Sequence, residues 1–213
     1  MREVMVYVEG PSDCYALEAL LASLLKTLQT QGVTVKFIAT EGKKRLMLHT
    51  PPKAVNILYN PYSIVIALPD LYPPNVGWPH QTPTELRGVL RLEFNKCLQR
   101  QGITDDRWQE RFKVFCFKYD LESLILAAEP QLSRRLGESA MQPDWTKPVE
   151  DQNHHIPPKR IVEKLFSEQG KSYQDTVDAP LILGSANYAD IGAACPQCFQ
   201  PFVDFLSSLL EKE

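Results

Sequence analysis

Four acidic residues follow three of the apolar runs that we expect to form buried strands. Glu9 comes directly after the run 4–8, and Asp70 follows the run 63–68 after a single proline. Asp120 and Glu122 come a few residues after the run 112–117. Ligands of open parallel sheets bind beyond the carboxyl ends of the strands, so we expect all four carboxylates at one edge of the sheet.

Carboxylates that gather in this way raise one another's pKa unless a cation neutralises them. Mg²⁺ or Mn²⁺ fits such a place, because Mg²⁺ takes oxygen ligands and commonly combines one or two carboxylates with the phosphates of a substrate. We therefore predict metal-assisted phosphoryl chemistry, with Glu9 as catalytic base or metal ligand and with Asp70, Glu122 and Asp120 as metal ligands. The alternative is that Asp120 caps a helix and Asp70 only begins a loop.

A local basic group offers a contact for nucleic acid. Lys43, Lys44 and Arg45 follow the predicted strand 33–39 and are expected near the same edge of the sheet. The net charge of the 213-residue chain is -3, so the chain as a whole lacks the positive charge typical of nucleic-acid-binding proteins. Any such binding depends on a local patch, and the alternative for these residues is a solvated helix face.

The elements that position these residues alternate between strands and helices. Continuous β-branched runs predict buried strands at 4–8, 33–39, 63–68 and 112–117. Apolar periodicity predicts helices at 15–28, 84–100, 120–128, from 130 onward, 158–168 and 196–210, with an amphipathic segment over 43–58. Strands separated by helices predict an α/β fold with a mainly parallel sheet flanked by helices and a C-terminal helical extension.

The chain divides most simply into residues 1–136, an α/β domain, and residues 137–213, a loop and helical extension packed on the same domain. The stretch 139–158 is poor in apolar residues and rich in proline, which predicts a long surface loop.

The cysteines predict a reducing compartment and no zinc site. There are five, an odd and scattered number, and the pair Cys195 and Cys198 has no second CxxC or well-spaced histidine pair to complete a zinc site. The N-terminus lacks the pattern of a signal peptide, and no apolar run approaches the ~18 residues that a membrane span needs. We therefore expect a cytoplasmic protein with no membrane contact.

The residues from Val6 to Asp13 resemble the opening motif of Toprim domains, the metal-binding module of topoisomerases, primases and OLD-type nucleases. In those families a glutamate after the first strand acts with a DxD pair after the third strand to bind Mg²⁺ and assist cleavage of a phosphodiester. The resemblance implies these roles for Glu9 and Asp70. The DxD position here reads Asp70-Leu71-Tyr72, so the second acid is missing unless Asp120 or Glu122 replaces it.

A narrower resemblance to the Toprim-like DUF4276 family covers most of the chain. Its signals are the segment from Tyr119 to Ala127, Pro157-Pro158-Lys159, and the segment from Cys195 to Phe199. Because this family is often grouped with OLD- or ABC-type ATPases, the resemblance implies an ATPase partner. Two functions follow: an Mg²⁺-dependent phosphodiesterase acting on nucleic acid, or a non-catalytic binding or regulatory module whose Toprim site is degenerate.

Overall fold

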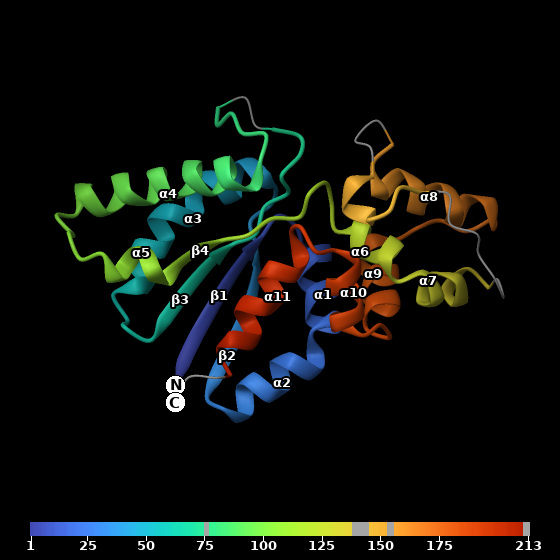
Figure 1. The fold of residues 1–213 in the computed structure, drawn as a ribbon, viewed down its shortest axis with the longest axis horizontal. Helices are drawn as coiled ribbons and strands as arrows, with labels where there is room; N and C mark the ends of the chain where they lie inside the picture. The colour runs from blue at the N-terminus through green and yellow to red at the C-terminus, as the bar shows by residue number, and fades with distance from the viewer. Residues whose placement is uncertain (75–76, 138–144, 153–155, 211–213) are drawn as a thin grey trace.

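A computed structural model of the chain describes residues 1–74, 77–137, 145–152 and 156–210. Within these ranges one parallel sheet is formed, with the strand order β2-β1-β3-β4 (Figure 1). The strands are β1 (Arg2–Val8), β2 (Val33–Ala39), β3 (Ser63–Ala67) and β4 (Phe112–Val114).

Helices connect and flank the strands. They are α1 (Pro11–Leu20), α2 (Ala22–Thr30), α3 (Lys43–Leu58), α4 (Pro83–Arg100), α5 (Arg107–Arg111), α6 (Glu122–Ala127), α7 (Glu129–Leu136), α8 (Pro158–Glu168), α9 (Asp175–Leu183), α10 (Tyr188–Ala194) and α11 (Phe199–Ser208), with a 3₁₀ turn at Val149–Asp151. In the described ranges, none of them combines the length and the apolar character that crossing a membrane requires.

Both faces of the sheet are covered, which explains why its strands are continuously apolar. Val4, Val6 and Val8 of β1 belong to a core cluster shared with α1, α2 and α11. Tyr7, which points to the other face, belongs to a second cluster shared with α3 and α4. Figure 1 shows α3 and α4 on one side of the sheet and α1 and α11 on the other, with α6 to α9 grouped beyond one end of the strands.

The predicted strands all occur, but β3 ends one residue earlier than expected and β4 ends three residues earlier. The register aligns Val8 of β1 with Ala39 of β2, so their carboxyl ends lie side by side. β4 ends at Val114 rather than at residue 117, and beyond it only an isolated bridge pairs Asp70 with Phe117. The chain after β3 and the chain after β4 therefore run together toward the predicted site.

The helices differ more from the sequence prediction. The expected helix 15–28 is two helices, α1 and α2, because the chain bends at Leu21. Leu21 itself stays buried, so the bend leaves the apolar periodicity unchanged and the sequence pattern does not reveal it. The helices α5, α9 and α10 were not predicted. The expected helix 196–210 begins only at Phe199.

The described part of the stretch 139–158 is not simply a surface loop, as the prediction has it. Val149 and Glu150 are buried. The Glu150 carboxylate accepts hydrogen bonds from the backbone N–H groups of Gln197, Cys198 and Phe199, at the start of α11. These hydrogen bonds hold the 3₁₀ turn at Val149–Asp151 against the start of α11. Residues 139–144 and 153–155 of the stretch lie outside the described residues.

The helical extension shares its core with the N-terminal part of the chain. Leu17 of α1, Leu124 of α6 and Phe202 of α11 belong to one buried cluster. The buried Asp178 of α9 forms an ion pair of 2.6 Å with Arg135 near the end of α7. Residues on both sides of position 137 therefore stabilise each other, and a domain boundary at 136 remains a prediction.

Candidate functional site

Glu9 and Asp70 lie together at the edge of the sheet. Glu9 is the residue after β1, and Asp70 lies three residues after the end of the neighbouring strand β3. The backbone N–H of Asp70 donates to Glu9 Oε1 over 2.9 Å. Because β1 and β3 are adjacent parallel strands, this contact follows from the topology, as the sequence predicts.

A third acid, Asp13, comes from the turn that begins α1. Its Oδ2 accepts the backbone N–H of Gly10 over 2.8 Å, which closes the first turn, and Pro11 starts the helix with a suitable backbone angle. In the sequence analysis Asp13 appears only as the last residue of the Toprim-like motif. Its position four residues after Glu9, across a tight turn, was the signal that the two carboxylates face the same space.

Asp120 and Glu122 approach from the chain before and within α6. Asp120 Oδ2 accepts the backbone N–H of Lys159 over 3.3 Å, while Asp120 Oδ1 is buried without a hydrogen-bond partner. Glu122 is buried and accepts a hydrogen bond of 3.2 Å from the Tyr173 hydroxyl, with the Lys159 ammonium 3.8 Å away. Asp120 lies two residues before the first residue of α6, and its capping role stays an alternative to its role as a metal ligand.

These residues line one open cleft of about 410 Å³, which we call the acidic cleft. The sequence analysis expected Glu9, Asp70, Asp120 and Glu122 at one edge of the sheet, and the structure places all four around this cleft. The sequence analysis missed three further charged lining residues, Asp13, Glu41 and Lys159, although Lys159 closes the Pro157-Pro158-Lys159 segment that carried the family resemblance. The charged side chains of the acidic cleft include Glu9, Asp13, Asp70, Asp120, Glu122 and Lys159.

Burial and mutual repulsion make these carboxylates costly to ionise. Burial, helped by the charges of Glu9, Asp13 and Asp120, raises the pKa of Asp70 well above its ordinary value. Burial, with the charge of Glu122, raises the pKa of Asp120 to about 7. Burial raises the pKa of Asp13 to about 6 and also raises that of Glu9. A bound cation would favour the ionised form of every one of them.

The donor set fits a hard cation such as Mg²⁺, but not a complete protein cage. Every acidic donor is a carboxylate oxygen, and Asp120 Oδ1 has no competing partner. Among the described residues, however, no three His, Cys, Asp or Glu side chains converge closely enough to hold a metal ion by themselves. Mg²⁺ bound by one or two carboxylates, with water and substrate phosphates completing its shell, is the mode that this arrangement can accept.

The predicted basic group 43–45 does not form one surface patch. The Lys43 ammonium turns inward and donates to the backbone carbonyls of Leu71, over 2.9 Å, and Pro73, over 2.6 Å. Lys44 and Arg45 are exposed, and Arg45 forms an ion pair with Glu41. Lys43 therefore fixes the loop after β3, and contact of Lys43, Lys44 and Arg45 with nucleic acid remains a prediction.

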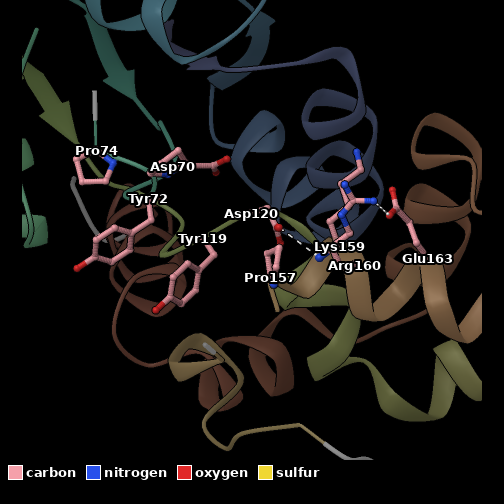
Figure 2. A pocket seen from close by; sticks show the side chains of 10 residues that line it. Asp70, Tyr72, Pro74, Tyr119, Asp120, Pro157, Lys159, Arg160 and Glu163 are labelled. Carbon is pink, nitrogen blue, oxygen red and sulfur yellow. Dashed lines mark hydrogen bonds and ion pairs between the residues drawn. The ribbon is translucent and has the colours of Figure 1, made fainter. Parts of the chain in front are cut away.

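A larger cavity of about 670 Å³ adjoins the acidic cleft and shares three of its residues, Asp70, Asp120 and Lys159. Tyr72 and Tyr119 line it, and their rings stack with centroids 5.3 Å apart and an interplanar angle of 25°. We call it the aromatic cavity; Figure 2 shows its lining residues. Tyr72 occupies the position where the Toprim resemblance predicts a second acid, so an aromatic ring replaces that carboxylate.

Comparison with known proteins agrees with this geometry. The family model "Domain of unknown function (DUF4276)" matches residues 8–207, which is nearly the whole chain. The chain belongs to the DUF4276 family. A search of curated proteins gave no match. The family expected from the sequence is therefore confirmed.

The chain is also similar to two solved structures. The C-terminal region of the Burkholderia pseudomallei OLD protein superposes with a TM-score of 0.52 at 18% identity, covering 99% of each chain. The C-terminal region of the Xanthomonas campestris pv. campestris OLD protein gives a TM-score of 0.47 at 16% identity, covering 98% of each chain. The first of these likenesses confirms the Toprim-like α/β fold.

Proposed function

We propose that the acidic cleft binds Mg²⁺ or Mn²⁺ and supports hydrolysis of phosphodiester bonds in nucleic acid. The observation that carries this proposal is the meeting of Glu9, Asp70 and Asp120 in one open cleft, with Asp120 Oδ1 left without a partner. When bound, the cation would polarise a phosphate oxygen and lower the pKa of a coordinated water. The Toprim resemblance of the residues around Glu9 supports the same chemistry.

The residues of the chain divide this work between them. Glu9 Oε1 accepts the Asp70 N–H, which orients the carboxylate at the acidic cleft, where it would bind the cation or accept a proton from water. Burial raises the pKa of Glu9 above its ordinary value, which makes the carboxylate a better proton acceptor. Lys159 is the positive side chain of the acidic cleft, and it can attract a phosphate to an otherwise negative surface.

An ATPase partner belongs to the same proposal. The Burkholderia structure is a C-terminal region, so in that protein a chain of this fold is part of a longer one. Together with the grouping of DUF4276 proteins with ATPases, this supports a nuclease module that works beside an ATPase. Coexpression with ATPases encoded next to its gene, followed by size-exclusion chromatography, tests this, and separate elution in every case would contradict it.

The cleavage proposal is tested with labelled single-stranded DNA, duplex DNA and RNA in Mg²⁺, Mn²⁺ or EDTA. Cleavage is expected only with a divalent cation, and Glu9→Gln and Asp70→Asn should abolish it. The matched control is Glu18→Gln, because Glu18 is an exposed glutamate of α1 outside the acidic cleft. Cleavage that survives both site substitutions would show that these residues do not have the proposed roles.

A second candidate is a non-catalytic binding module, and Tyr72 favours it. Tyr72 replaces the second acid, and its hydroxyl donates to the Gln81 carbonyl over 2.6 Å, so this side chain takes part in the loop rather than in metal binding. Isothermal titration with Mg²⁺ and Mn²⁺ separates the candidates. Binding at millimolar concentrations or below that is lost in Glu9→Gln supports the metal site, whereas no binding supports the degenerate module.

A further inference from the structure

The aromatic cavity has the composition of a site for a flat ring beside a negative group. Tyr72 and Tyr119 form one part of its lining, with Pro74 and Pro157, while Lys159 and Arg160 supply positive charge. Figure 2 shows the two tyrosine rings on one side and the side chains of α8 on the other, with Asp120 between them and Asp70 above the tyrosines. Its volume of about 670 Å³ lies within the range of small-molecule sites.

The tyrosine pair is already arranged for stacking. The two rings lie within 25° of parallel with centroids 5.3 Å apart, so they form a preformed stack rather than two independent side chains. The Tyr72 hydroxyl is fixed by the Gln81 carbonyl, which holds its ring in place. A nucleobase that enters the cavity extends this stack, and every base offers a π face for such a contact.

The charges fix where the phosphate of such a nucleotide lies. The carboxylates of Asp70 and Asp120 exclude a phosphate from their side of the cavity unless a cation is present. Lys159 lines both the aromatic cavity and the acidic cleft. A phosphate bound near the Lys159 ammonium would therefore lie where the aromatic cavity adjoins the acidic cleft. Arg160 lies next along α8 and is paired with Glu163 over 3.2 Å. A base in the aromatic cavity thereby places its own phosphate at the acidic cleft.

We infer that the aromatic cavity binds one unpaired nucleobase, stacked against Tyr72 and Tyr119, and that the chain therefore selects single-stranded nucleic acid. This inference rests on the proposed function for the role of the neighbouring cleft. It also assigns a function to Tyr72. This residue stands where the Toprim pattern has its second acid, and its ring offers a stacking surface beside the remaining acids.

Fluorescence anisotropy in EDTA tests this binding without metal and without cleavage. The probes are a fluorescein-labelled decathymidylate, a decauridylate, and the decathymidylate annealed to decaadenylate. Single strands should bind more tightly than the duplex. Tyr119→Leu and Tyr72→Leu should each weaken single-strand binding about 10-fold, the scale of losing one base stack, whereas Tyr119→Phe should stay within about twofold of wild type.

The matched control is Tyr62→Leu, because Tyr62 is an exposed tyrosine outside the aromatic cavity. Circular dichroism checks the fold of each variant. Tyr119→Phe keeps the aromatic ring and serves as the comparison if a leucine variant does not fold. Equal binding of single strand and duplex, or leucine variants that bind like wild type, would overturn the inference. Because this assay contains no divalent cation, selective single-strand binding in EDTA together with no cleavage in Mg²⁺ would overturn the proposed function and leave the base site standing.

Discussion

The acidic cleft has a sheet side and a helix side, and the two hold their carboxylates differently. On the sheet side, a backbone hydrogen bond joins Asp70 to Glu9, and both acids follow paired strands. On the helix side, Glu122 depends on side chains that come later in the chain, the Tyr173 hydroxyl from the connection between α8 and α9 and the Lys159 ammonium of α8. The backbone hydrogen bond fixes the position of the Glu9 carboxylate, which suits a residue that takes part in the reaction. The side-chain contacts of Glu122 can adjust, which suits a residue that balances charge.

Each side of the acidic cleft also has a lysine, Lys43 on the sheet side and Lys159 on the helix side, and the two make different contacts. The Lys43 ammonium is bound to two backbone carbonyls of the loop after β3, so it holds the loop while it lies near Glu9 and Asp70. The Lys159 ammonium reaches Asp175 over 3.0 Å and is partly exposed. Only the lysine of the helix side is placed to meet a ligand that arrives from solvent.

The largest expected difference between the two sides is in activity, with the same substitution made on each. Glu9→Gln should lower divalent-cation-dependent cleavage about 100-fold or more, because it removes a general base or a direct ligand. Glu122→Gln should lower it about 10-fold, the scale of a supporting residue around a metal. Initial cleavage rates at saturating Mg²⁺ measure both, and equal losses would show that the two sides share one role.

The sheet side could be predicted from the sequence because it depends on local and strongly patterned signals. The run 4–8 and the run 63–68 are apolar on both faces, so each indicates a buried strand, and parallel pairing then brings the residues that follow them together. The positions of Glu9 and Asp70 follow from these two steps. The same reasoning placed β2, whose predicted and observed bounds are identical.

The helix side could not be predicted in detail, because it depends on packing between distant segments. Lys159 reaches the acidic cleft only because α8 packs beside α6, and nothing in the residues around 159 indicates that partner. Helix α9 was missed because Pro180 interrupts its apolar pattern, although it packs on α1 through Ala179 and Leu183. Lys43 was taken for a surface cation because its carbonyl partners lie almost thirty residues later in the chain.

The next effect concerns the dependence of stability on pH on the helix side. The pKa of Asp120 is about 7, above the ordinary 3.8, so between these pH values the folded state binds a proton that the unfolded state has released. The free energy of unfolding should therefore fall as the pH rises from about 4 through 7 and level off above that. In Asp120→Asn this contribution is absent, so the variant should gain about 2 kcal/mol relative to wild type between pH 5 and pH 8.

Urea denaturation in EDTA measures this difference, because the chelator removes any cation that would favour the ionised carboxylate. Glu18→Gln serves as the control, since Glu18 is exposed and removes one carboxylate without touching the acidic cleft. A constant difference between Asp120→Asn and wild type across this pH range would mean that Asp120 titrates in the folded protein as it does in the unfolded chain.

A smaller effect distinguishes the lysine of the sheet side from its neighbour. Lys43→Met should lower the free energy of unfolding by about 1–2 kcal/mol, because it leaves the Pro73 carbonyl and the acids of the sheet side without their cation. Lys44→Met is the matched control, because Lys44 is exposed, and it should change stability by less than about 0.5 kcal/mol. Equal effects of the two substitutions on the free energy of unfolding would mean that the contacts of the Lys43 ammonium do not stabilise the loop after β3.

The smallest expected effect isolates the hydroxyl that orients Glu122. Tyr173→Phe removes only the donor of the 3.2 Å hydrogen bond to Glu122 Oε1 and keeps the ring that packs against Phe166. Stability should fall by about 1 kcal/mol at neutral pH, and less at acidic pH, where a protonated Glu122 needs the donor less. Tyr15→Phe, at an exposed position, should have no effect. A Tyr173→Phe protein as stable as wild type would mean that the Tyr173 hydroxyl does not hold Glu122, and that the Lys159 ammonium is the contact that positions it.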